Sequence, residues 1–360
     1  MIDSNVSKFY INRKGDCVFY NTLDDQSYIK QENKEKRKLG SAVQFLYASE
    51  DLSKIYYNQN KVLYMVEDGN EPKKIASNVE RVLQIYKSGA IYYLANAEDD
   101  SKRNVPLYSL FFYAQGKSTL VKKRCILAAD RLGGKDYSLY CSGDKPIMVF
   151  SVIEEGEFEK HPNEDVFTLG KFYVCKESKI IGQLGKGFKG GFVLNAKQDT
   201  IYYVQDFSMV LYRVKLEDEK ISKSTKYADI QNESDFTLDE NKVIYLKNRN
   251  DTEQDLYIDG KKIDTYVDNR PIRIGKTNYY TYIKGEGKTL ILYYEGVKQV
   301  IADHVTSYVA YREDRIAYVN INSKGERNLY LYEGKEEDKQ IDSNVLNLLI
   351  PEVNTFGCGN

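Results

Sequence analysis

The segment SYVAYREDRIAYVN, residues 307–320, decides the fold of this chain. It contains two runs of aromatic and β-branched residues, separated by the charged pair Glu313-Asp314. Val, Tyr and Ile favour the half-buried surface of a pleated strand, and a short polar turn between two such runs is typical of a β-hairpin. We therefore predict antiparallel strands at Ser307–Arg312 and Arg315–Asn320.

The residues that follow complete a unit of four strands. A polar turn at Asn322–Glu326 precedes a third predicted strand, Asn328–Tyr332. The turn Glu333-Gly334-Lys335 then leads to a fourth strand at Lys339–Asp342. Gly, Asn and Asp are the residues that tight turns require. Four short antiparallel strands in sequence are typical of one blade of a β-propeller.

A five-residue phrase recurs between such units. Clear copies are Ile2–Val6, Ile75–Val79, Ile301–Val305 and Ile341–Val345, and looser copies are Leu39–Val43 and Ile263–Val267. Most clear copies carry Asn in the fourth position, and Asn tolerates positive φ and bonds to nearby backbone. The phrase therefore predicts a tight crossing between consecutive repeats. His304 stands in the Asn position of its copy, which predicts a structural role for it.

The second strands set the period of the repeat. Their aromatic and β-branched cores begin at residues 18, 55, 91, 147, 201, 243, 279 and 316. The successive differences are 37, 36, 56, 54, 42, 36 and 37 residues, so a period of 36 or 37 carries two large insertions. Propeller blades of the WD40 type have a period of about 40–45 residues. The coils of an open β-solenoid, the rival fold, are usually shorter.

We predict an all-β fold, a single closed β-propeller of eight four-stranded antiparallel blades, with seven blades as the alternative. The repeats begin near residues 6, 43, 80, 131, 186, 231, 268 and 306, and residues 1–360 form one domain with almost no helix. An unpaired strand edge invites aggregation, so one terminal segment is expected to pair with the blade at the other end.

Composition excludes several classes of function. With 52 basic and 53 acidic residues, the chain has no field to attract nucleic acid. It has no run of about 18 apolar residues that could span a membrane, and no signal peptide. It is expected in the cytoplasm, or outside the cell or in the envelope if an upstream anchor was removed. The five cysteines form no CxxC pair, so we expect buried thiols and neither metal nor cofactor.

The Ile-Tyr-Tyr cores, the Leu-Tyr third strands such as Leu256-Tyr257, and the Gly-Lys turn at Gly260-Lys261 resemble a family of bacterial propellers. These are the low-density-lipoprotein-receptor-like or TolB-like propellers, and the resemblance covers Ile2 to Val345. It implies a binding or sensing module of the cell envelope, often behind a membrane anchor. The chain departs from six-bladed members in repeat number and lacks their Tyr-Trp-Thr-Asp signature.

No motif of catalysis is present in the sequence. GxSxG, HExxH and P-loop patterns are missing, and only His161 and His304 could supply an imidazole. We therefore predict a non-enzymatic binding, scaffold or sensor module. The alternative is a glycan-active hydrolase or lyase that uses carboxylates at the channel mouth.

The two insertions suggest where a partner binds. The second-strand and third-strand positions are 7 residues apart in repeat 2 (Tyr57 to Tyr64), 15 in repeat 3 (Tyr93 to Tyr108) and 18 in repeat 4 (Val149 to Phe167). Long loops on a rigid scaffold commonly carry function, although neutral surface growth explains them equally well.

We predict that Ala97–Val105 and Glu154–Asp165 form one rim on the ligand-binding face. The candidate residues are Glu98, Asp99, Asp100, Lys102, Arg103, Glu154, Glu155, Glu157, His161 and Asp165. A protein or glycan ligand is expected there. The second segment is strongly acidic, which favours a basic partner or a cation over nucleic acid.

Overall fold

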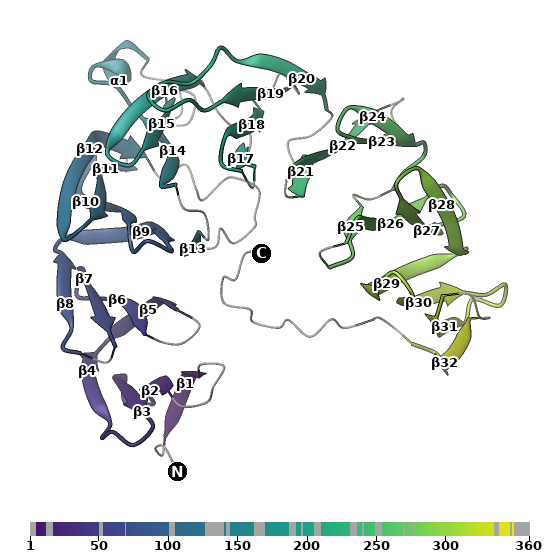
Figure 1. The fold of residues 1–360 in the computed structure, drawn as a ribbon, viewed down its shortest axis with the longest axis horizontal. Helices are drawn as coiled ribbons and strands as arrows, with labels where there is room; N and C mark the ends of the chain where they lie inside the picture. Colours follow the sequence, from purple (N-terminus) through teal and green to yellow (C-terminus); the bar gives the residue numbers. More distant parts are fainter. Residues whose placement is uncertain are drawn as a thin grey trace. The chain divides into compact units, whose positions relative to one another are not determined.

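The computed structural model describes residues 5–11, 17–49, 53–68, 70–100, 105–126, 140–141, 145–161, 170–186, 192–195, 197–204, 210–230, 236–239, 241–248, 254–268, 271–275, 277–334, 338–345 and 348. These residues form thirty-two strands and one four-residue helix, which confirms the all-β prediction (Figure 1). Within them, no helix is long and apolar enough to cross a membrane. The chain forms two compact units, one built on Met1–Phe188 with Asp218–Lys220, the other on Lys189–Glu217 and Ile221–Asn354.

The first unit contains two four-stranded sheets and one eight-stranded sheet, all labelled in Figure 1. Repeat 1 comprises β1 (Val6–Ile11), β2 (Cys17–Thr22), β3 (Gln26–Gln31) and β4 (Arg37–Ser41). Repeat 2 comprises β5 (Val43–Ala48), β6 (Lys54–Gln59), β7 (Val62–Glu67) and β8 (Lys73–Ala76). Repeat 3 comprises β9 (Val79–Tyr86), β10 (Ile91–Asp100), β11 (Val105–Ala114) and β12 (Lys117–Ile126). Repeat 4 comprises β13 (Tyr140–Cys141), β14 (Ile147–Val152), α1 (Glu157–Lys160), β15 (Lys171–Lys176) and β16 (Lys179–Lys186).

The second unit contains four four-stranded sheets, each an antiparallel meander in chain order. Repeat 5 comprises β17 (Phe192–Leu194), β18 (Thr200–Val204), β19 (Val210–Lys215) and β20 (Thr225–Asp229). Repeat 6 comprises β21 (Phe236–Asp239), β22 (Lys242–Asn248), β23 (Gln254–Ile258) and β24 (Lys261–Asp264). Repeat 7 comprises β25 (Ile272–Arg273), β26 (Tyr279–Lys284), β27 (Thr289–Tyr294) and β28 (Val297–Ala302). Repeat 8 comprises β29 (Val305–Arg312), β30 (Arg315–Ile321), β31 (Arg327–Tyr332) and β32 (Lys339–Ser343).

The described strands form seven sheets, where the sequence predicted eight separate blades. Repeats 3 and 4 share the eight-stranded sheet, in the order β13-β9-β10-β11-β12-β14-β15-β16. The cause is the length of β12, which has ten residues where the last strands of the four-stranded sheets have four to six. Its final residues Cys125 and Ile126 pair with β14. The short strand β13 pairs in parallel with β9 of repeat 3, and not with the other strands of repeat 4.

One aromatic pair recurs in the middle of every repeat. The second-strand aromatic lies directly opposite a third-strand aromatic, as in Tyr57↔Tyr64 and Tyr245↔Tyr257, whose rings stack at 5.3 and 5.1 Å. The other pairs are Tyr20↔Tyr28, Tyr93↔Phe111, Phe150↔Tyr173, Tyr203↔Tyr212, Tyr280↔Tyr293 and Tyr318↔Tyr330. Directly opposed aromatic side chains are among the more stabilising cross-strand pairs. The pairs explain where the tyrosines stand in the sequence.

In repeat 4 the aromatic pair shows that the third strand was predicted in the wrong place. The third strand was expected near Phe167, a residue outside the described part of the chain. The strand that pairs with β14 is β15, and the partner of Phe150 is Tyr173. The connection between the second and third strands of repeat 4 is therefore longer than the sequence indicated.

The fourth residue of the recurring phrase has a left-handed backbone in all six copies. Its φ lies between 50° and 62° at Asn5, Ala42, Asn78, Tyr266, His304 and Asn344. Asn reaches this conformation more readily than most residues, which explains why Asn recurs there. The expected structural role of His304 is consistent with its φ of 58°.

The same position ties consecutive repeats together through backbone hydrogen bonds. At the crossing into repeat 3, the Val79 amide donates to the Lys61 carbonyl of repeat 2 at 2.8 Å. The Asn78 carbonyl accepts from the Asn96 amide of repeat 3 at 3.2 Å. At the crossing into repeat 8, Val305 donates to Lys288 at 3.0 Å, while His304 accepts from Ile321. Each crossing therefore lies beside the turns between second and third strands.

The buried core lies between neighbouring repeats. One cluster combines Phe19 of repeat 1 with Tyr57 of repeat 2, and another combines Tyr245 of repeat 6 with Tyr202 of repeat 5. Further clusters join repeats 2 and 3, 3 and 4, 6 and 7, and 7 and 8. Packing of each repeat on its neighbours is the arrangement expected of a repeat protein. The buried thiols Cys17, Cys125 and Cys175 lie in this core, as predicted for them.

The expected pairing of a terminal segment with the opposite end concerns Met1–Asn5 and Leu346–Asn360, of which only Asn5 and residue 348 are described. That expectation, like the start of repeat 4 near residue 131, falls outside the described residues.

Candidate functional site

The first predicted loop is largely a continuation of the β10–β11 hairpin. Glu98 pairs with Leu107, Asp99 with Pro106 and Asp100 with Val105. A register shift between Ala95 and Glu98 precedes these pairs, and bulges of this kind let a strand bend and continue. Ala97–Asp100 is therefore strand where the sequence predicted loop, because the antiparallel ladder resumes after the bulge.

The acidic residues of this hairpin lie at the end where β10 leads into β11. Glu98 is exposed. Lys102 and Arg103, the predicted basic residues of the segment, lie outside the described part of the chain.

The second predicted loop contains the only helix among the described residues. Gly156, with φ 78°, precedes α1, and His161 follows it. Glu155 is exposed, whereas Glu157, the first helical residue, is 8% exposed. The Glu157 carboxylate lies 3.6 Å from Lys160 Nζ in the same helix. Asp165 lies outside the described residues.

A hydrogen bond anchors the start of this connection to β15. The Tyr173 hydroxyl donates to Glu154 Oε1 at 2.7 Å. Lys171 Nζ lies 3.8 Å from the same oxygen, and Lys122 Nζ lies 5.8 Å from the centre of the Tyr173 ring. The hydrogen bond from Tyr173 and the two nearby lysines hold the pKa of Glu154 below its ordinary value. Burial and the same carboxylate raise the pKa of the Tyr173 phenol to about 12.

Two hydrogen bonds between Ile153 and Arg124 also hold the start of this connection. The Ile153 amide donates to the Arg124 carbonyl at 3.1 Å, and Arg124 Nε donates to the Ile153 carbonyl at 3.3 Å. The β14–β15 connection therefore begins from a position that β12 holds on the backbone and β15 holds through Glu154.

Both connections flank the end of β12. Cys125 pairs with Tyr108 of β11 on one side and with Val152 of β14 on the other. From this point β11 leads back toward Val105 beyond the end of β12, while the chain after Val152 runs beside Arg124. The two groups of candidate residues thus lie on opposite sides of Cys125 along the direction of β12.

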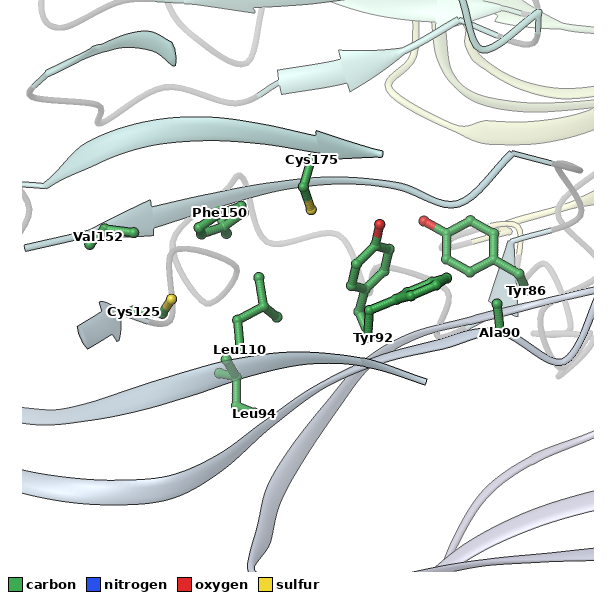
Figure 2. Close-up of a cluster of buried hydrophobic side chains, with 10 residues drawn as sticks. Tyr86, Ala90, Tyr92, Leu94, Leu110, Cys125, Phe150, Val152 and Cys175 are labelled. Atoms are coloured by element: carbon green, nitrogen blue, oxygen red, sulfur yellow. The ribbon is translucent and has the colours of Figure 1, made fainter. Parts of the chain in front are cut away.

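Buried tyrosines hold the opposite end of the β14–β15 hairpin on repeat 3. The Tyr86 hydroxyl donates to the Ile147 carbonyl at 2.6 Å, and the Tyr92 hydroxyl donates to the Glu177 carbonyl at 2.7 Å. Figure 2 shows the two rings side by side, with the Tyr92 hydroxyl directed toward the strand that carries Cys175. Repeat 4 is therefore fixed to repeat 3 at both ends of its hairpin.

The sequence indicated the acidic residues of this site and missed their basic and aromatic partners. Lys171 and Tyr173 stand two residues apart, so they share one face of β15. That alternation would have identified them if the third strand had been placed correctly. Among the described residues, no group of three or more His, Cys, Asp and Glu side chains could hold a metal ion.

No protein-family model matches the sequence, and no curated protein matches it. Solved structures resemble it at low similarity. The acylaminoacyl peptidase of Pyrococcus horikoshii is 12% identical, with a TM-score of 0.33, over 94% of this chain and 52% of the peptidase. The β-propeller domain of the Trilobed protease from Pyrococcus furiosus is 14% identical, with a TM-score of 0.34, over 94% and 98% of the two chains. The Dos1 propeller is 9% identical, with a TM-score of 0.38, over 92% and 93%.

The chain thus spans about half the length of the P. horikoshii peptidase. All three TM-scores lie below 0.5, and the fold assignment rests on the repeated four-stranded sheets, the aromatic pairs and the crossings described above.

Proposed function

We propose that the chain is a single closed propeller of eight blades that acts as a non-enzymatic binding or scaffold module. Its partner contacts the connections of repeats 3 and 4, and is a protein with a basic contact surface. The observation that supports this proposal is that the strands next to both connections, β11 and β14, pair with the end of β12 in one shared sheet.

The eight cross-strand aromatic pairs support eight equivalent blades. Repeats 3 and 4 each keep their own pair, Tyr93↔Phe111 and Phe150↔Tyr173, although they share a sheet. The shared sheet therefore represents two blades joined at their edges. Full closure removes the exposed edges and faces that an open array of sheets would leave.

The anchored geometry supports binding over neutral surface growth. Glu154 and Glu157 have partners within the chain, so their charges serve the structure of the connection. Glu98 and Glu155 are exposed and remain for a partner. The described start of the β14–β15 connection is held by these contacts, so it loses less conformational freedom when a partner binds. The resemblance to envelope propellers points to the cell envelope as the compartment.

The test is quantitative capture of partners from an extract of the source organism. One variant shortens the segment 97–105, and a second shortens 155–165 and leaves Glu154 in place. A matched control shortens the turn Asn322–Glu326, which joins the second and third strands of repeat 8. The proposal requires a partner that the control retains and that both long-segment variants lose while remaining folded.

Charge reversal gives a second test without any change of length. Glu98→Lys and Glu155→Lys should weaken capture, and the effect should shrink at high salt because exposed charges are screened within about 10 Å at 0.1 M. Retention of every captured partner by all four variants would refute the proposal.

A further inference from the structure

A buried carboxylate in the second unit holds two lysines. Asp264, at the crossing from repeat 6 to repeat 7, has a side chain that is 5% exposed. Its Oδ1 accepts from Lys284 Nζ at 2.7 Å and from the Thr265 amide at 2.8 Å. Its Oδ2 accepts from the Tyr282 hydroxyl at 2.7 Å, and Lys298 Nζ lies 3.2 Å away. The carboxylate is thus satisfied by donors from β26 and β28 and by the Thr265 amide, directly after β24.

Asp264 is charged in this environment. Burial, the largest influence, raises its pKa, but the hydrogen bonds from Lys284, Tyr282 and Thr265 outweigh burial and lower the pKa below its ordinary value. The cluster therefore contains one negative and two positive groups, and carries an excess of one positive charge.

The neighbouring ion pairs are balanced. Lys262 pairs with Asp255 at 2.6 Å, and Lys288 pairs with Asp268 at 2.7 Å. Each of these pairs joins one ammonium group to one carboxylate. The two lysines on Asp264 are the exception among these three clusters.

Both lysines are partly exposed and have more N–H donors than the contact with Asp264 uses. An ammonium group has three N–H donors, and the contact with Asp264 occupies one on each lysine. The Lys284 and Lys298 side chains are 30% and 39% exposed. One carboxylate thus holds two part-exposed ammonium groups close together, which reduces the entropy lost when a shared anion binds.

The backbone of an exposed tyrosine, Tyr266, contacts the residue that follows Lys284. Tyr266 is 41% exposed and has a φ of 58°. Its carbonyl accepts from the Gly285 amide at 2.7 Å, which places it next to Lys284 in space. A bulky residue in this conformation is unusual, and three of the other five copies of the phrase have Asn there.

We propose that Lys284 and Lys298 form an oxyanion subsite that binds the phosphate group of a small soluble ligand, whose remaining part covers the Tyr266 ring. Charge-assisted hydrogen bonds from two ammonium groups to one phosphate are stronger than neutral ones. The site uses residues separate from the connections of repeats 3 and 4, so it stands or falls independently of the proposed partner surface.

Calorimetric titration of the full chain at low ionic strength tests the subsite, with inorganic phosphate and glucose 6-phosphate as probes. Lys298→Gln leaves Asp264 with Lys284, Tyr282 and the Thr265 amide. It should weaken both probes on the order of tenfold, the loss expected for one charge-assisted hydrogen bond. Lys288→Gln is the matched control, because it removes the same charge from a balanced pair in the same repeat.

Tyr266→Asn tests the ring separately. It installs the residue that other copies of the phrase carry, so the crossing should fold normally. Glucose 6-phosphate should bind the wild type more tightly than inorganic phosphate does, and Tyr266→Asn should abolish that difference. Absence of saturable phosphate binding, or equal weakening by Lys288→Gln, would overturn the proposal. Capture of the chain by phosphatidic acid vesicles without binding of either soluble probe would also overturn it.

Discussion

The hydroxyl of Tyr92 in β10 donates a hydrogen bond to the backbone carbonyl of Glu177, which lies in the turn between β15 and β16. The same hydroxyl lies 3.1 Å from the Pro146 carbonyl, at the start of β14. One side chain of repeat 3 therefore contacts both strands of the β14–β15 hairpin at the same end, where Ile147 pairs with Lys176. Tyr92 is fully buried and Pro146 is buried, whereas Glu177 is exposed.

Tyr92→Phe should lower the free energy of unfolding by about 1 kcal/mol, because the substitution removes the hydrogen bond to the Glu177 carbonyl. Urea unfolding followed by circular dichroism measures the difference. Tyr311→Phe is the matched control, since Tyr311 is 65% exposed and its loss of a hydroxyl should have little effect. Equal stability of the Tyr92→Phe variant and the wild type would show that Tyr92 does not fasten repeat 4.

Substitutions at Asn78 test the left-handed crossing. Asn78→Val should destabilise the chain by roughly 1–2 kcal/mol, because a β-branched residue is strained at a φ of 55°. Asn78→Gly should be close to neutral, since glycine adopts positive φ freely. Thermal unfolding of the two variants distinguishes backbone strain from loss of the side chain. If both variants lose the same stability, the Asn side chain and not its φ is what matters.

The buried tyrosines predict a loss of stability at alkaline pH. Burial raises the pKa of Tyr56, Tyr57 and Tyr227 from 10.0 to about 12. The folded chain therefore binds these protons more tightly than the unfolded chain, and their contribution is fully present below pH 10 and lost as pH rises toward about 12. Urea unfolding at a series of alkaline pH values measures this directly. A free energy of unfolding that stays constant through that window would contradict the prediction.

Glu154 predicts an effect of the opposite sign at acid pH. Its lowered pKa means that the carboxylate contributes stability above its unfolded value of 4.5, and that this contribution is lost as pH falls through the folded value. Tyr173→Phe removes the hydrogen bond that lowers this pKa most. A carbon-13 NMR titration should therefore find the Glu154 pKa closer to 4.5 in the variant than in the wild type. An unchanged pKa would show that Lys171 and Lys122 alone set it.

The sequence predicted those parts of the fold that depend on local pattern. The left-handed conformation favours Asn, so the crossings could be predicted from Asn5, Asn78 and Asn344. The Tyr-Tyr cores marked second strands because alternation and aromatic content are local properties. The order of four strands in each repeat followed from these two signals.

The parts that escaped prediction depend on pairing across distance. The pairing of Cys125 with Val152 joins two repeats at their edges. Nothing in the sequence near either residue distinguishes these two from ordinary strand residues. The partners of Asp264 come from β26 and β28, so their convergence follows from the register of a sheet. For the acidic candidate site, the residue types were visible, while the contact between Glu154 and Tyr173 required the correct third strand.

The closed single-domain propeller is the central proposal, and small-angle X-ray scattering of the full chain tests it most directly. A compact single domain of 360 residues should have a radius of gyration of about 21 Å. We predict a value close to this, with one maximum in the pair-distance distribution. A clearly larger radius with two resolved maxima would mean that the two units are separate bodies, and would contradict the closed ring.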